Sequence, residues 1–110
     1  MMRGSRAWLV AAALAATNPL PATAGDARGG RAKAATICQG CHGMDGLSKH
    51  PEAPNIAGQV ENYLVKTLHQ YHSGERQNEL MTLAAKELTD AEIENLAAYY
   101  AAIQIEVIPP

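Results

Sequence analysis

The sequence Cys38-Gln39-Gly40-Cys41-His42 places two thiols three positions apart and an imidazole directly after the second thiol. Two thiols at this spacing on a turning backbone can reach the two vinyl groups of one haem and form thioethers, which anchor the porphyrin twice. The imidazole that follows can then take one axial position on the iron. The five residues therefore predict a covalent c-type haem site, with Cys38 and Cys41 as the anchors and His42 as an axial ligand.

Two other chemistries use a pair of cysteines at this spacing. A dithiol redox centre of the thioredoxin kind is expected between a strand and a helix, and no strand-like alternation flanks the motif. A zinc site needs at least two further ligands, but the sequence has no third cysteine and, besides His42, only His50, His69 and His72. Both alternatives are less favoured than haem attachment.

The first 24 residues have the pattern of a secretory signal peptide. Two arginines precede the apolar run 7–16, and the Ala-Thr-Ala sequence at 22–24 matches a cleavage site. The run is about half as long as a membrane-spanning helix, so removal of the signal is favoured over a membrane anchor. We therefore expect export to the periplasm and one folded domain over residues 25–110, with no membrane span.

The composition of residues 25–110 limits the classes of function. Acidic residues outnumber basic ones, and no basic cluster is interleaved with aromatic residues, so no nucleic-acid partner is expected. Tryptophan and phenylalanine are absent from this range, and a domain of this size is near the lower limit for a stable core. A large flat apolar cofactor would complete the core, so we expect the domain to be largely unfolded without haem.

Apolar periodicity and capping residues predict an all-α domain. One helix is expected over 60–72, where apolar residues recur at spacings of three and four, and Gly74 marks its end. Another is expected over 90–103, where Thr89 and Glu92 form a capping box.

The first helix of the domain is expected over 28–38, although it contains two glycines that disfavour helix. Either the helix begins later, at Arg31, or Gly30 permits the close approach of another helix. The glycine- and proline-rich segment 43–58 predicts a loop. Residues 104–110 are expected to be extended, and their apolar side chains either lie on the protein or meet a partner.

Met81 is the best candidate for the second axial ligand. A thioether is a weak neutral ligand that favours ferrous iron, so a His/Met pair gives a comparatively high reduction potential. The competing interpretation is that Met81 fills a gap in the core. In that case the second position is open or is taken by one of the histidines, at His50, His69 or His72.

The chain from residue 25 onward resembles a class I c-type cytochrome of the small bacterial periplasmic monohaem type. The haem motif, the position of Met81 and the segment Pro54-Asn55-Ile56-Ala57-Gly58, which is similar to the family's Pro-Asn-Leu-x-Gly, carry the resemblance. Leu96-Ala97-Ala98-Tyr99 resembles the C-terminal helix that crosses the first helix at a small residue, here Gly30.

This resemblance implies a compact fold of three to five short helices wrapped around one covalent haem c. It also implies that the carbonyl of Pro54 accepts the N–H of the His42 imidazole, a contact that fixes the ring of a ligating histidine. Many relatives carry an aromatic residue where this chain has Ala34, so a less tightly filled helix crossing is expected.

The function that follows is non-enzymatic electron transfer, with both axial positions filled and weak, transient contacts with redox proteins. The segment 74–81 resembles cytochromes of respiratory chains and also cytochrome subunits of periplasmic flavin dehydrogenases. A second hypothesis is therefore a cytochrome subunit of a periplasmic dehydrogenase complex, which the apolar residues at 105–108 favour. A third is an enzyme or gas-binding protein with an open iron position, which would bind carbon monoxide without mutation.

Overall fold

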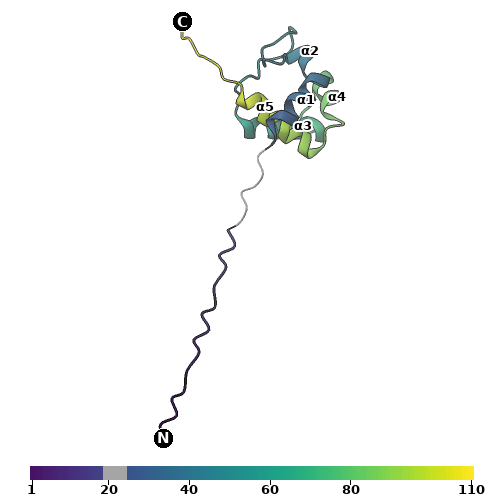
Figure 1. Ribbon diagram of the computed structural model, residues 1–110. Coiled ribbons are helices and arrows are strands. Elements are labelled where there is room, and N and C mark those ends of the chain that lie inside the picture. The colour runs from purple at the N-terminus through teal and green to yellow at the C-terminus, as the bar shows by residue number, and fades with distance from the viewer. Residues whose placement is uncertain (19–24) are drawn as a thin grey trace.

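The computed structural model describes residues 1–18 and 25–110, and the helices gather into one body in Figure 1. Within the described residues there are five helices and no strand: α1 (Ala27–Ile37), α2 (Gln39–His42), α3 (Glu61–Ser73), α4 (Glu79–Ala85) and α5 (Asp90–Ala102). The all-α prediction is confirmed. Residues 1–18 are exposed and form no helix, and the predicted cleavage sequence at 22–24 lies outside the described residues.

Helix α1 begins before its two glycines. Asp26 is the N-cap residue, and its side chain accepts a hydrogen bond from the backbone N–H of Arg28 at 3.0 Å. This satisfies one of the amide groups that the first helical turn leaves unpaired. The later start at Arg31 is therefore wrong.

Gly30 lies where α1 crosses α5. A Cβ atom built on Gly30 would stand 1.9 Å from the carbonyl oxygen of Asn95 and 2.8 Å from the Cβ of Tyr99. Only a hydrogen atom fits there, so the interpretation that Gly30 permits close helix approach is confirmed. Ala34, one turn later, has no exposed surface, so the small side chain leaves no opening to solvent at the crossing.

Helix α5 contributes more residues to the buried core than any other helix. The capping box is present, with the Glu92 N–H donating to Thr89 Oγ1 and the Thr89 N–H donating to Glu92 Oε1, each at 3.1 Å. The helix ends at Ala102, one residue before the predicted end. Its apolar stripe contributes half of a buried cluster composed of Ala34, Leu64, Ala85, Leu88, Ile93, Leu96, Ala97 and Tyr100.

Helix α3 ends at Ser73, one residue after the predicted end, and Gly74 follows it as the predicted stop. Gly74 adopts the left-handed conformation with φ of 84°, which a residue without Cβ adopts at little cost. After residue 103 the chain forms no helix or strand, and Ile105, Val107 and Ile108 are exposed.

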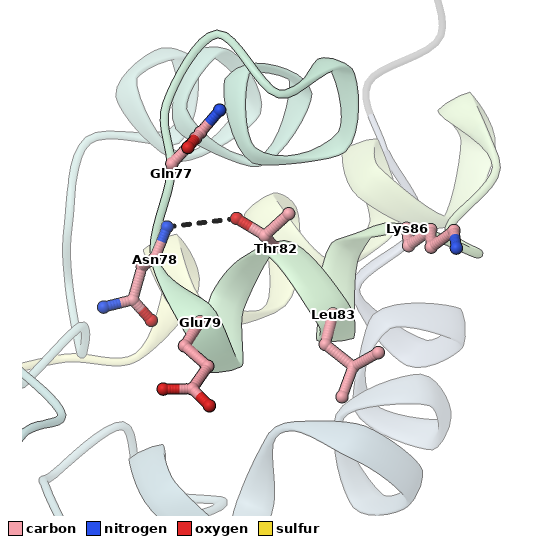
Figure 2. Close-up of a pocket in the computed structure, with 6 residues that line it drawn as sticks. All are labelled: Gln77, Asn78, Glu79, Thr82, Leu83 and Lys86. Carbon is pink, nitrogen blue, oxygen red and sulfur yellow. Dashed lines mark hydrogen bonds between the residues drawn. The ribbon is translucent and has the colours of Figure 1, made fainter.

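Helix α4 was not expected from the sequence. Its N-cap residue is Asn78, whose side-chain oxygen accepts from the backbone N–H groups of Leu80 at 3.1 Å and Met81 at 3.0 Å. In return, the backbone N–H of Asn78 donates to Thr82 Oγ1 at 3.0 Å, as Figure 2 shows. Among the seven residues of α4, Ala85 alone is buried.

Candidate haem site

A cavity of about 1000 Å³ brings the predicted site residues together. Cys38 lines it from the junction between α1 and α2, and Cys41 and His42 line it from α2. Pro54 lines it from the loop before α3, and Met81 lines it from α4. Segments that are far apart in the sequence thus contribute to one space.

The remaining walls suit a large apolar cofactor. The volume lies at the upper end of the range for small-molecule and cofactor sites. Aliphatic side chains from six segments line it: Ile37, Ile56, Leu64, Leu68, Leu80, Leu88 and Leu96. Two thiols, an imidazole and a thioether facing one apolar space are the donor set that a covalently attached haem requires, so the residues fit this group.

The imidazole of His42 is buried and oriented. Its side chain is 7% exposed, and its Nδ1 atom lies 2.9 Å from the carbonyl oxygen of Pro54. Because a carbonyl can only accept, Nδ1 carries the proton and Nε2 is left free for a ligand. The hydrogen bond also holds the ring in one orientation.

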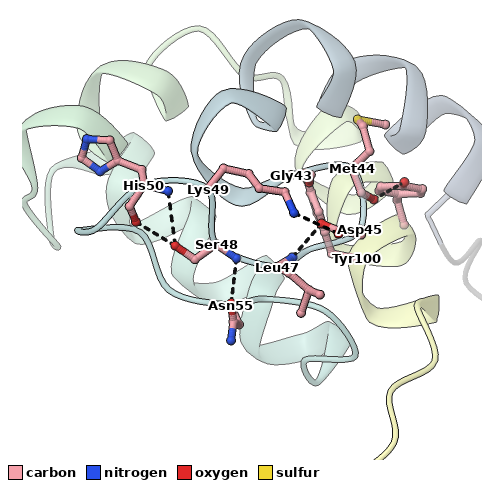
Figure 3. A network of polar contacts seen from close by, with 10 residues as sticks. Gly43, Met44, Asp45, Leu47, Ser48, Lys49, His50, Asn55 and Tyr100 are labelled. Carbon is pink, nitrogen blue, oxygen red and sulfur yellow. Dashed lines mark hydrogen bonds and ion pairs between the residues drawn. The ribbon is translucent and has the colours of Figure 1, made fainter.

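The loop that carries Pro54 is folded back on the haem motif. The backbone N–H of Lys49 donates to the carbonyl of Cys41 at 2.8 Å. The side chain of Asn55, the neighbour of Pro54, accepts from the backbone N–H of Ser48 at 2.7 Å, as Figure 3 shows. These bonds fix the position of the carbonyl that His42 contacts.

Asp45 organises the beginning of the same loop. Its carboxylate accepts from the backbone N–H of Leu47 and from the ammonium of Lys49, each at 3.0 Å (Figure 3). The Leu47 N–H, and after it the Lys49 ammonium, hold the pKa of Asp45 below its ordinary value. The carboxylate therefore stays ionised and keeps both contacts at neutral pH.

Two consecutive tyrosines of α5 hold the turn that follows His42. Tyr100 donates its hydroxyl hydrogen to the carbonyl of Gly43 at 2.9 Å, and Tyr99 donates to the carbonyl of Met44 at 2.6 Å. Sequence reasoning missed these contacts, which join positions more than 50 residues apart. A Tyr-Tyr pair on a core helix indicates buried hydroxyl groups that need acceptors, but it does not name the acceptors.

The environment of Cys38 argues against a dithiol redox centre. Burial raises the pKa of the Cys38 thiol to about 11, and the nearby ammonium of Lys33 lowers it by less. The thiol is therefore protonated at neutral pH. Reactive cysteines instead have lowered pKa values, because the thiolate is the nucleophile.

Two of the four candidates for the second axial position line the cavity. Met81 and His50 line it, whereas His69 and His72 do not. His69 Nδ1 lies 3.9 Å from a carboxylate oxygen of Asp90. His72 Nδ1 is hydrogen-bonded to the carbonyl of Ala85 at 2.8 Å.

Of the two candidates that line the cavity, His50 belongs to the same loop as Pro54, and Met81 comes from the separate helix α4.

A second, more open depression of about 490 Å³ on α4 contains none of the predicted ligands; Figure 2 labels its lining residues. The longest helices of the described chain have 13 residues, and none has both the length and the apolar composition needed to cross a bilayer.

Comparison with known proteins identifies the family. The model of the family described as cytochrome c matches residues 27–103. Cytochrome c4 of Pseudomonas aeruginosa is 44% identical over 84 residues, which are 76% of this chain and 41% of the relative. Cytochrome c-554(548) of Halomonas halodenitrificans is 42% identical over 80 residues, which are 70% of this chain and 95% of the relative.

One chain in the solved structure of thiosulfate dehydrogenase from Marichromatium purpuratum has a similar fold. The TM-score is 0.65 at 29% identity, and the match covers 70% of this chain and 18% of that one. This chain thus spans less than half of the cytochrome c4 relative and nearly all of cytochrome c-554(548). The class I cytochrome c fold expected from the sequence is confirmed, and the chain belongs to the cytochrome c family, whose members carry covalently bound haem c and transfer electrons.

Proposed function

We propose that residues 25–110 form a periplasmic electron carrier that holds one haem c, with His42 and Met81 as its axial ligands. The observation that carries this proposal is the single cavity lined by both cysteines, His42, Pro54 and Met81. Membership of the cytochrome c family supports the same chemistry.

Each residue has a defined task in this proposal. Cys38 and Cys41 supply the sulfur atoms of the two thioethers, and His42 supplies Nε2 while Pro54 fixes its ring. Met81 supplies a neutral thioether that favours the ferrous state. The bound haem provides an iron that gains and loses one electron, and the protein's part is to exclude water and to keep both ligands in place.

The proposal of one haem per chain rests on the sequence. There are two cysteines in the chain, enough for one C-x-x-C-H motif. The chain also covers 95% of cytochrome c-554(548) but 41% of cytochrome c4. Mass spectrometry of the exported protein tests this count and the predicted cleavage after Ala24, because it should give residues 25–110 plus one haem.

Carbon monoxide binding tests the axial ligands. With both positions filled, the ferrous protein should not bind carbon monoxide, and Met81→Ala should open a position and allow binding. His50→Ala is the matched control, because His50 lines the same cavity but comes from the loop of Pro54. Binding by the unmodified protein, or binding that appears in His50→Ala and not in Met81→Ala, would overturn the assignment.

A second candidate function is that of a cytochrome subunit in a periplasmic dehydrogenase complex. The similarity to a chain of thiosulfate dehydrogenase favours it, as do the exposed apolar residues Ile105, Val107 and Ile108. A subunit should co-purify with a larger catalytic chain and lose it when residues 105–110 are removed. A free carrier, which meets partners through small transient contacts, should purify alone.

A further inference from the structure

Helix α4, which carries Met81, has little apolar anchorage. Among its seven residues Ala85 alone is buried, and Leu83 is 70% exposed. Its main packing neighbour is α3. An isolated helix of this length is not stable in water, so polar contacts at its two ends must contribute to its position.

Different hydrogen bonds hold the two ends of α4. At the start, Asn78 accepts from the backbone N–H of Met81 itself at 3.0 Å. At the end, the carbonyl of Ala85 accepts from His72 Nδ1 at 2.8 Å and from the Leu88 N–H at 3.2 Å. The contact between Asn78 and Met81 is local. The contact with His72 is not, because His72 belongs to the last turn of α3 and lies 13 positions from Ala85.

We propose, building on Met81 as the distal ligand, that His72 is a positioning residue for that ligand. The hydrogen bond from His72 to the Ala85 carbonyl fastens the end of α4 to the end of α3. The bond is present only while α4 keeps the placement in which Met81 faces the cavity. It therefore favours the methionine-bound state over states in which α4 has shifted and the thioether has left the iron.

Three substitutions separate positioning from general destabilisation. His72→Ala removes the donor. His72→Asn keeps an N–H donor at the same number of bonds from the backbone as Nδ1, so it should restore the contact. His69→Ala is the matched control, because His69 lies on the same helix and its nearest charged neighbour is Asp90 of α5, not a residue of α4.

The measurement is an absorbance titration of the ferric holoprotein with imidazole, which binds the iron only after Met81 has left. Its apparent affinity therefore reports the fraction of molecules with Met81 detached. Loss of one hydrogen bond should tighten apparent imidazole binding by about two- to tenfold in His72→Ala. His72→Asn and His69→Ala should bind imidazole as the unmodified protein does.

An unchanged imidazole affinity in His72→Ala would overturn the proposal, even if the variant melts at a lower temperature. So would an affinity in His72→Asn as tight as that in His72→Ala. If His72→Ala yields no holoprotein, His72→Gln, which displaces the donor by one methylene, takes its place with the same expected tightening. Met81→Ala distinguishes the two proposals: if it binds imidazole no more tightly than the unmodified protein, the ligand assignment fails instead.

Discussion

Replacing Gly30 by alanine tests the helix crossing on which the domain is built. The added Cβ would lie 1.9 Å from the Asn95 carbonyl oxygen, and ordinary van der Waals contact begins at 3.4 Å, so the two backbones must separate by about 1.5 Å. Overpacking of a buried site costs about 1–3 kcal/mol, and backbone collisions fall at the upper end. Alanine favours a helix over glycine by about 1 kcal/mol. The net loss in the free energy of unfolding is therefore about 2 kcal/mol.

Gly29 provides the matched control in the same helix. A Cβ atom there would meet the side-chain atoms Asn95 Nδ2 at 3.0 Å and Asp26 Oδ2 at 3.1 Å. Side chains can move aside by a few tenths of an ångström where a backbone cannot. Gly29→Ala should therefore be neutral or should stabilise the protein by up to about 1 kcal/mol.

Urea denaturation of the two holoproteins, followed by far-ultraviolet circular dichroism, measures the difference. With a slope of about 1 kcal/mol per molar urea for a small domain, Gly30→Ala should lower the midpoint by about 2 M. Gly29→Ala should leave it unchanged or raise it. Equal midpoints for Gly30→Ala and the unmodified protein would refute the close-approach argument.

Three further predictions concern polar contacts around the same core. Tyr100→Phe leaves the Gly43 carbonyl without its donor and should cost about 1–3 kcal/mol in urea denaturation at neutral pH. Burial also raises the pKa of Tyr100 above its ordinary value of 10.0. The folded chain therefore keeps a proton that the unfolded chain loses, and the decline in stability above pH 10 should be shallower in the variant. The ammonium of Lys33 lowers the pKa of Glu92 below its ordinary value of 4.5. The free energy of unfolding should therefore fall as the pH drops below 4.5 and Glu92 becomes protonated, and this fall should be smaller in Glu92→Gln. Asn78→Ala should cost about 1 kcal/mol and weaken the absorption band of methionine-ligated ferric haem.

Local sequence signals predicted the parts of the fold that depend on a few neighbouring residues. The capping box at Thr89 and the glycine stop at Gly74 fixed two helix ends to within one residue. Each works through backbone groups one turn away, so the sequence alone contains the whole interaction. The cavity-lining positions of both cysteines, His42 and Pro54 followed in the same way from short motifs.

Helix α4 was missed because its sequence signal is weak. The helix is short, it buries Ala85 alone, and it follows a polar segment that reads as loop. The usable signal was Asn78 followed by Glu79, a capping residue and an acidic first turn. The contact of His72 with Ala85 could not be predicted either, because it exists only once α3 and α4 lie side by side.

The bonds from Tyr99 and Tyr100 to the turn after His42 have a consequence for biogenesis. During synthesis, the haem motif emerges from the ribosome more than 50 residues before the two tyrosines whose hydroxyl groups later fix it. Contacts of such wide sequence separation form late in folding. We therefore expect both thiols to stay accessible for haem attachment until α5 is made and its tyrosines bind the turn after His42.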